Sequence, residues 1–264
     1  MAEAALIDIH NATLWRGNTL VFENLNLTIP QHQRIAILGP NGSGKTTLLK
    51  TINRELYPVV KDDSWIRILG RDRWNVWELR KRIGVVSHDL HNRYTPTTTA
   101  IEVVVSGFQS SIGIHGLLAA RVSQEQLVAA EKILLELGMA KFLQTELRAM
   151  STGEQRRCLL ARAMVHNPDT LILDEPTTGL DISASFDYLR QISRLAQAGQ
   201  NIIIVTHHLN EIPPEIERVV LLKQGSIVAD GSKEETLTSE LLSDIYETHV
   251  RVSQVEGHFL AYPG

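Results

Sequence analysis

Short, continuous apolar runs bounded by turns recur along the chain and predict buried parallel strands. They lie at residues 35–38, 170–173 and 201–206. Before about Tyr57 the pattern differs, because short β-like runs alternate with turns. Near the other end, Gln224–Gly225 separates two apolar runs and predicts a hairpin. The pattern as a whole predicts an α/β fold with an N-terminal β region.

Helical spacing takes over in the middle of the chain. Ser123 and Gln126 form a capping box, which satisfies backbone N–H groups at the start of a helix. An apolar stripe at helical spacing follows and ends at Gly138, a residue type favoured just after a helix. Asn75 is placed to cap another helix that runs to Arg82. The region between the strands is therefore expected to be mainly helical.

A glycine-rich turn stands between the first buried run and a helix. Its residues are Gly39, Pro40, Asn41, Gly42, Ser43, Gly44, Lys45, Thr46 and Thr47. The glycines let successive N–H groups turn inward, and the helix adds its positive end, so the turn can hold phosphate. Lys45 is placed to contact the β- and γ-phosphates, and the Thr46 hydroxyl to bind Mg²⁺. Strand, turn and helix together predict a nucleotide site rather than a chance glycine turn.

Two adjacent acids end a second buried run. The carboxyl end of a parallel strand opens into a ligand crevice, and Asp174 and Glu175 stand at that end. Asp174 is expected to hold Mg²⁺ through water. Glu175 is expected to orient and deprotonate the attacking water. The alternative, a solvated acid pair, is weaker because the chain also carries a phosphate loop.

A serine-glycine motif opens a long helical pattern between those two sites. Ser151 and Glu154 form a capping box, so helix initiation alone explains part of the motif. Capping does not require Gly153, whereas a helix start that presses its backbone against a phosphate does. The order of phosphate loop, serine-glycine helix start and acidic strand end resembles that of the ATP-binding cassette (ABC) ATPases.

The resemblance implies a fold with defined parts. The fold is α/β, a P-loop NTPase (RecA-like) core with an N-terminal antiparallel β region and an inserted helical subdomain. The implied divisions are 1–88 for the first part of the core, 89–150 for the helical subdomain, 151–231 for the signature helix and the rest of the core, and 232–264 for a C-terminal extension.

The resemblance also implies roles for further residues. His207 matches the family's switch histidine, a catalytic residue that contacts the γ-phosphate, while His208 is expected at the surface. Trp15 lies near the family's adenine-stacking aromatic; a place in the core is the alternative. Ser151, Gly153 and Glu154 are expected at the nucleotide of an opposing subunit.

Two positions depart from the family pattern. Thr152 stands where a second glycine is usual, and its side chain either crowds the opposing phosphate or shifts the helix start. His88 stands where the family has a glutamine that links Mg²⁺ to a mobile helical region. An imidazole can ligate a metal, but its reach and charge differ from those of an amide. Coupling through this loop is therefore expected to be unusual.

Composition and charge limit the partners and the compartment that are expected for this chain. The net charge of −4 gives no basic excess for binding nucleic acid. Cys158 is the only cysteine, which indicates a reducing compartment and a small buried side chain. The N-terminus lacks the basic start of a signal peptide, and the apolar runs are far shorter than the ~20 residues of a membrane span. A separate chain must therefore cross any membrane that this protein serves.

Each nucleotide motif occurs once, and this decides the expected assembly. In the family, the serine-glycine helix of one cassette completes the ATP site of another, so the resemblance implies a homodimer around two Mg-ATP. We expect ATP hydrolysis that drives transport through a transmembrane permease, at the cytoplasmic face of the membrane. The segments 237–242 and 257–259 resemble the tails of metal-chelate and siderophore importer ATPases.

Two other functions compete with transport. A soluble ABC ATPase coupled to a non-transport partner is the alternative, which the departures at His88 and Thr152 allow. A P-loop kinase or GTPase of another class does not explain the serine-glycine motif, Glu175 and His207 together.

Overall fold

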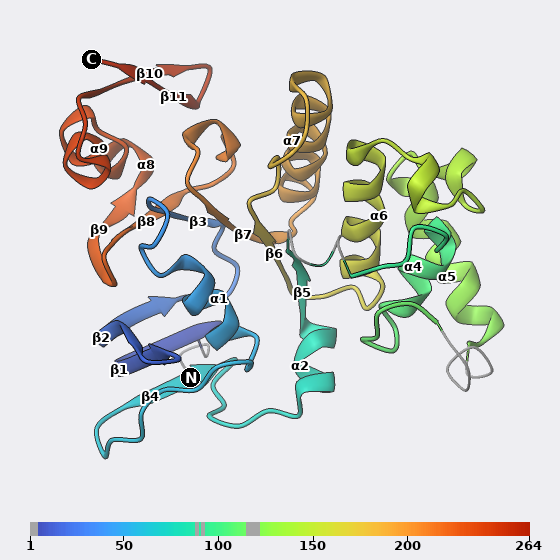
Figure 1. Cartoon of the computed structure of the whole chain (residues 1–264), viewed down its shortest axis with the longest axis horizontal. Helices are drawn as coiled ribbons and strands as arrows, with labels where there is room; N and C mark the ends of the chain where they lie inside the picture. The colour runs from blue at the N-terminus through green and yellow to red at the C-terminus, as the bar shows by residue number, and fades with distance from the viewer. Residues whose placement is uncertain (1–4, 88–89, 91–92, 115–121) are drawn as a thin grey trace. The chain divides into compact units, whose positions relative to one another are not determined.

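The computed structural model describes residues 5–87, 90, 93–114 and 122–264, which form two compact units. The first unit holds Met1–Leu79 and Asn201–Gly264, and the second holds Arg80–Gln200. Both combine strands with helices (Figure 1). The α/β class is therefore confirmed.

An antiparallel sheet begins the first unit. Its strands are β1 (Ile7–Arg16), β2 (Thr19–Ile29) and β4 (Trp65–Ile68), in the order β2-β1-β4. Both neighbours of β1 run antiparallel to it. Buried apolar and exposed polar residues alternate towards the end of β2, which places one face of the sheet on the core. The predicted N-terminal antiparallel region is confirmed.

Parallel strands form the other sheet region of the first unit. In spatial order they are β7 (Asn201–Thr206), β3 (Ile35–Leu38) and β8 (Arg218–Lys223). Both β3 and β7 are buried along their whole length, as their continuous apolar runs predict. An edge strand, β9 (Ser226–Ser232), returns antiparallel to β8. The turn at Gln224–Gly225 is confirmed, with φ angles of 47° and 75° that suit a tight hairpin.

Helix α1 (Lys45–Ile52) follows β3 through the glycine-rich turn. Its apolar side chains Leu48, Leu49 and Ile52 are buried, and the helix contacts β1. Figure 1 shows α1 between the antiparallel sheet and β3. The packing of these buried side chains therefore holds the start of α1 at the end of β3.

The C-terminal part of the first unit forms a module of its own. Its elements are α8 (Lys233–Thr236), α9 (Ser239–Tyr246), β10 (Val250–Val255) and β11 (His258–Pro263). The two strands pair as an antiparallel hairpin, α9 contacts β10, and β11 contacts the short 3-10 helix η4 (Leu209–Glu211). Leu242, Ile245 and Phe259 are buried and fix this module to the unit.

The second unit begins at Arg80, within α2 (Val76–Arg82). Asn75 caps the start of this helix as predicted, because its Oδ1 accepts from the Trp77 N–H at 2.9 Å. Two buried strands of this unit, β5 (Ile83–Val86) and β6 (Thr170–Asp174), run parallel.

Helices make up most of the second unit. They are α4 (Ala100–Ser106), α5 (Gln124–Glu136), α6 (Thr152–Met164) and α7 (Ile182–Gln197), with 3-10 helices η2 (Ala140–Phe142) and η3 (Leu147–Ala149). α6 is central, since it contacts α4, α5, α7 and β5. Ser123 caps α5 in the predicted capping box.

Cys158 lies in α6 and is fully buried, as predicted. Burial raises the pKa of its thiol to about 12, because the thiolate would lose its hydration. Within the described residues, no helix is both long enough and apolar enough to cross a membrane.

Candidate functional site

The glycine-rich turn is shaped by close approaches that exclude side chains. A Cβ at Gly39 would lie 2.3 Å from the carbonyl oxygen of Leu222 on β8. Gly44 has φ of 111°, and a Cβ there would lie 2.5 Å from Cζ of the buried Phe22. Both positions therefore require glycine, one for space and the other for backbone conformation as well.

The turn ends at a helix start that lacks an acidic or capping side chain. Gly44 provides no side-chain cap for α1, and the first turn contains no Asp or Glu. The Lys45 side chain is buried and its Nζ donates to the carbonyl oxygens of Gly39 (2.7 Å) and Pro40 (3.1 Å). The Ser43 hydroxyl is buried and has no hydrogen-bond partner among the described residues. A hydroxyl, an uncapped helix start and an ammonium thus stand at three successive residues of the turn, and this set of donors suits phosphate.

Other predicted residues of the first unit are more open. Thr46 is exposed on the first turn of α1, where its hydroxyl can reach a ligand of the loop. Trp15, on β1, is 45% exposed, so the alternative that placed it in the core is wrong. An open indole face is available for stacking.

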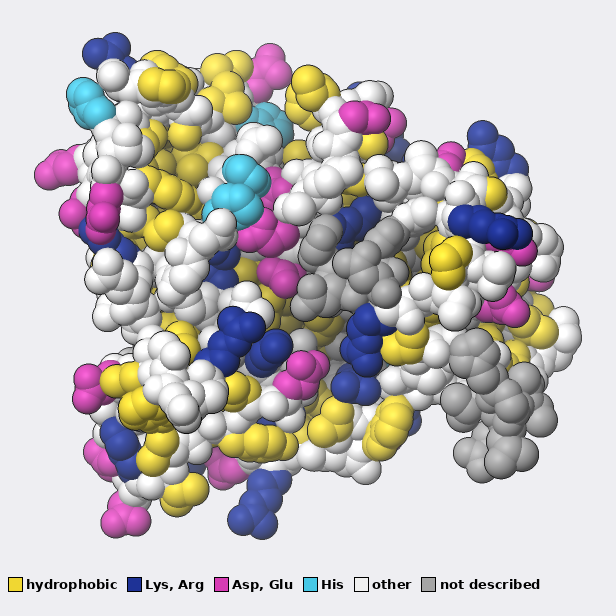
Figure 2. Space-filling view, in the orientation of Figure 1, with side chains coloured by type: hydrophobic (Ala, Val, Ile, Leu, Met, Phe, Trp, Pro, Cys, Tyr) yellow, Lys and Arg dark blue, Asp and Glu magenta, His cyan; other side chains and the backbone are white. Residues whose placement is uncertain are grey.

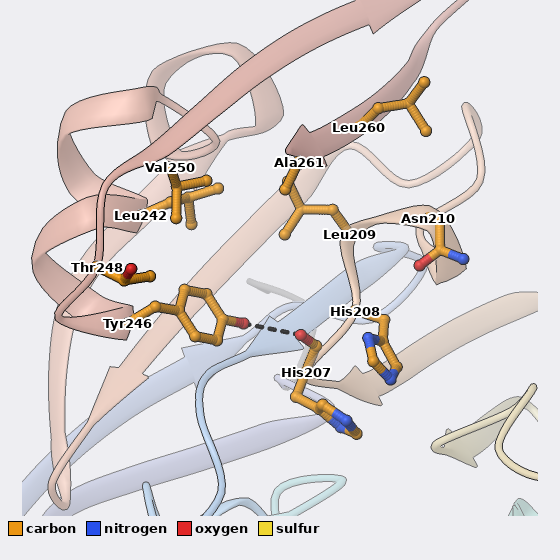
Figure 3. Close-up of a pocket in the computed structure, with 10 residues that line it drawn as sticks. All are labelled: His207, His208, Leu209, Asn210, Leu242, Tyr246, Thr248, Val250, Leu260 and Ala261. Carbon is orange, nitrogen blue, oxygen red and sulfur yellow. Dashed lines mark hydrogen bonds between the residues drawn. The ribbon is translucent and has the colours of Figure 1, made fainter. Parts of the chain in front are cut away.

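His207 follows β7 and is half-buried. Its ring centroid lies 3.8 Å from that of His208, which is exposed as predicted. The backbone carbonyl of His207 accepts a hydrogen bond of 2.9 Å from the hydroxyl of Tyr246, the last residue of α9 (Figure 3). Residues from two parts of the sequence thus define the backbone at this histidine.

The acidic pair lies in the second unit, at the end of β6. Both Asp174 and Glu175 are half-buried. Glu175 has φ of 50°, a left-handed conformation that is uncommon for a residue with a side chain and turns the chain sharply after the strand. The Thr178 hydroxyl donates to Oε2 of Glu175 at 3.3 Å, which orients the carboxylate. The buried Arg156 of α6 donates to the carbonyl of Thr178 at 3.1 Å and so steadies the same turn.

The predicted capping box at the start of α6 is confirmed. The Glu154 N–H donates to the Ser151 hydroxyl oxygen at 3.4 Å, and the Ser151 N–H donates to the Glu154 carboxylate at 2.8 Å. Gly153 is buried, and a Cβ there would lie 3.1 Å from Cβ of Ala184 on α7. Close helix packing therefore explains this glycine within one unit, without any phosphate.

A shallow pocket of about 180 Å³ opens beside this helix start in the second unit. It is lined by Ser151, Gly153, Arg157, Asp181, Ser183, Ala184, Asp187 and Tyr188. Asp181 caps α7 through a 2.8 Å bond from the Ala184 N–H. Exposed Ser151 and Thr152 leave the helix start open to a partner.

Not every predicted residue has a described place. Trp15, the glycine-rich turn and His207 belong to the first unit, and Ser151–Glu154 with Asp174 and Glu175 to the second. His88, expected at the metal, lies outside the described residues. Within those residues, no three His, Cys, Asp or Glu side chains gather as a metal site.

Sequence reasoning missed three side chains that shape the site: Phe22, Arg156 and Tyr246. Each acts through a partner distant in sequence, and only Arg156 lies within a segment that the sequence pattern marks, the start of the serine-glycine helix. The family resemblance implied a C-terminal extension at 232–264, but no feature of that segment indicated a contact with His207.

Comparison with known proteins gives a consistent result. The family model described as "ABC transporter" matches residues 22–178. The chain is 31% identical to the hemin import ATP-binding protein HmuV of Bradyrhizobium diazoefficiens, with 96% of this chain and 93% of that protein covered. It is 32% identical to the ferric enterobactin transport ATP-binding protein FepC of Escherichia coli, with 89% and 84% covered.

Solved structures share the fold. A metal-chelate type ABC transporter in an inward-facing conformation has a chain that matches with a TM-score of 0.77 at 22% identity, covering 98% of this chain and 96% of that one. An ATP-binding cassette of an ABC transporter in its ADP conformation matches with a TM-score of 0.73 at 21% identity, covering 92% and 97%.

Proposed function

Because the chain belongs to the family of ABC transporter ATP-binding proteins and is therefore an ATPase, we propose that it powers import of a metal chelate. Two copies close around two Mg-ATP, and the closure is coupled to a separate membrane permease. The protein works at the cytoplasmic face of that membrane. One observation carries the nucleotide part of the proposal, the phosphate cradle formed by Lys45, Ser43 and the uncapped start of α1.

The glycine-rich turn binds the phosphates. Backbone N–H groups at the start of α1 donate to the anion, and Lys45 neutralises the β- and γ-phosphates. The Thr46 hydroxyl holds Mg²⁺ directly, and Asp174 holds it through water. Trp15 stacks on the adenine through its open face.

Hydrolysis is assigned to Glu175 and His207. The Glu175 carboxylate orients a water molecule and accepts its proton, while His207 donates a hydrogen bond to the γ-phosphate as charge develops there. The left-handed backbone at Glu175 and the Thr178 hydroxyl support this assignment, because both fix the direction of the carboxylate.

The opposing subunit completes each site. Ser151, Gly153 and Glu154 open a helix whose first residues, Ser151 and Thr152, are exposed, and the sequence contains one copy of this motif. Ser151 and the positive end of α6 therefore meet the γ-phosphate bound by the other copy. We assign residues 89–150 as the helical subdomain that contacts the permease, with 1–88 and 151–231 as the core and 232–264 as the extension.

The cargo class rests on the relatives. The names of HmuV and FepC state hemin import and ferric enterobactin transport, and both proteins align over most of their length. We therefore propose an iron or metal chelate as the cargo. Deletion of the gene should abolish uptake of radiolabelled haem or of a ferric siderophore; unchanged uptake of both would remove this cargo class.

The nucleotide mechanism is tested by Glu175→Gln. The amide keeps the shape of the carboxylate but cannot accept a proton, so hydrolysis should fall by about 10²- to 10⁴-fold while ATP binding persists. Size-exclusion chromatography with Mg-ATP should then detect a stable dimer. The matched control is Glu131→Gln on the exposed face of α5, which should hydrolyse ATP normally. A Glu175→Gln protein that stays monomeric and hydrolyses ATP at the normal rate would contradict the role.

A further inference from the structure

The C-terminal module contacts the backbone of the histidine that we assign to the γ-phosphate. The hydroxyl of Tyr246 donates to the carbonyl oxygen of His207 at 2.9 Å (Figure 3). We propose that Tyr246 is a positioning residue for His207, so that the C-terminal module sets the direction of its imidazole. This inference rests on the proposed role of His207 in binding the γ-phosphate.

The segment around His207 is fixed on one side by its own side chains. The His208 N–H donates to the Thr206 hydroxyl oxygen at 2.9 Å. The same hydroxyl is hydrogen-bonded to the carboxylate of Glu211, which is fully buried in η4. Leu209 is buried as well. These contacts hold the residues before and after His207, and Tyr246 adds a hold on its carbonyl group.

The other side of the segment borders a pocket instead of a packed core. The pocket measures about 510 Å³ and is lined by His207, His208, Leu209, Asn210, Leu242, Tyr246, Thr248, Val250, Leu260 and Ala261. Figure 3 shows the Tyr246 ring reaching from α9 to the His207 carbonyl. β11 contacts η4, and the open space of the pocket beside His207 adds no dispersion contacts. The hydrogen bond from Tyr246 holds the His207 carbonyl on this side.

Tyr246 itself is well anchored. The N–H groups of Val250 and Val252 on β10 donate to the hydroxyls of Ser243 (2.9 Å) and Ser239 (3.0 Å) on α9. At the end of α9, Lys223 of β8 donates to the Asp244 carbonyl at 2.6 Å. The helix is thus tied to both the hairpin and the central strands, and a movement of the module would move the Tyr246 hydroxyl with it.

The surface of this module is partly apolar. In Figure 2 hydrophobic side chains gather over α9 and the β10–β11 hairpin. Leu260 and Tyr262 of β11 are 42% and 47% exposed, and Leu260 also lines the pocket. Leu260 of β11 and Tyr246 of α9 thus line the same pocket.

Small displacements matter at a group that must meet a phosphate. A backbone carbonyl fixed by Tyr246 restricts the peptide that follows His207, and so limits the directions open to the imidazole. Catalytic groups lose much of their effect when displaced by about 1 Å. Loss of the bond should therefore weaken recognition of the γ-phosphate more than it weakens folding.

The test compares Tyr246→Phe with Tyr262→Phe, which removes the same hydroxyl from an exposed tyrosine of the same module. The affinities for ATPγS and for ADP are measured by calorimetry. The affinity for ATPγS divided by that for ADP reports how strongly the γ-phosphate is bound, without hydrolysis. Tyr246→Phe should lower the ratio about three- to tenfold, the worth of one hydrogen bond, and Tyr262→Phe should not change it. Melting temperatures of both proteins separate this effect from a loss of stability. An unchanged ratio in Tyr246→Phe, whether or not its melting temperature falls, would overturn the inference.

A double variant identifies the route of the effect. In a His207→Ala background, Tyr246→Phe should cause no further change in the ATPγS-to-ADP ratio, because the residue that it positions is absent. An equal change in both backgrounds would overturn the inference. If His207→Ala alone leaves the ratio and the hydrolysis rate unchanged, the proposed role of His207 fails instead. The two failures are therefore distinguishable.

Discussion

Replacement of Ser151 by alanine separates helix capping from nucleotide chemistry. The substitution removes the hydroxyl that accepts from the Glu154 N–H, and leaves the second half of the capping box, because the Glu154 carboxylate binds a backbone N–H. The lost bond is long, at 3.4 Å, so the cost in unfolding free energy should be at the lower end for an N-cap, about 0.5–1 kcal/mol. Ser151 is exposed, so no cavity adds to that cost.

A loss of this size cannot lower activity through the folded fraction. A domain with an ordinary unfolding free energy of about 5 kcal/mol or more stays over roughly 99% folded after losing 1 kcal/mol. If Ser151 contacts the γ-phosphate of the opposing copy, hydrolysis should fall about 100-fold, as is usual when one donor to a developing charge is removed. Urea unfolding measures the first quantity, and steady-state phosphate release measures the second.

The chain provides a matched control in Ser123→Ala. Ser123 caps α5, a helix of the same length in the same unit, through a bond of 3.2 Å from the Gln126 N–H. Ser123→Ala should lower the free energy of unfolding as much as Ser151→Ala does, and should leave the rate of ATP hydrolysis unchanged. If the two variants hydrolyse ATP equally well, capping explains Ser151 completely and the nucleotide role is refuted.

Two further predictions concern the phosphate turn and the signature helix. Gly44→Ala should cost about 1–3 kcal/mol of unfolding free energy through backbone strain and should also abolish ATP binding through the clash with Phe22. Gly199→Ala, with φ of 94° and no atom within 4 Å of the added Cβ, should show the strain alone in urea unfolding and bind ATP normally; equal behaviour of the two would contradict the steric argument. Cys158, with a pKa raised to about 12 by burial, stays a thiol below that pH in the native protein, so N-ethylmaleimide at about pH 8 should label it only after unfolding. Rapid labelling of the native chain, seen by mass spectrometry, would contradict its burial.

Local patterns accounted for much of the fold. Continuous apolar runs identified β3, β6 and β7, and two serine capping boxes identified the starts of α5 and α6. These features depend on neighbours within a few residues, so the sequence contains the information directly. The Gln224–Gly225 hairpin was predictable for the same reason.

Contacts between distant residues could not be predicted in this way. Gly153 faces Ala184 on another helix, and nothing in the capping motif indicates that neighbour. Arg156 is buried and reaches the Thr178 carbonyl, which is unusual for a charged residue and is not indicated by its neighbours in sequence. The bond between Tyr246 and His207 joins residues 39 positions apart. The roles assigned to Trp15, Ser151 and His88 stay predictions from the family resemblance.

The hydrogen bonds of Lys45 within the glycine-rich turn affect how nucleotide can leave. A buried ammonium without a partner is costly, so a lysine that faced only phosphate would resist the departure of nucleotide. Lys45 Nζ donates to the carbonyls of Gly39 and Pro40, so two of its three donors have partners within the turn itself. If Lys45 binds phosphate as proposed, these carbonyls compete with the phosphate for its donors and lower the net affinity for nucleotide. The departure of ADP would then leave the ammonium hydrogen-bonded within the turn.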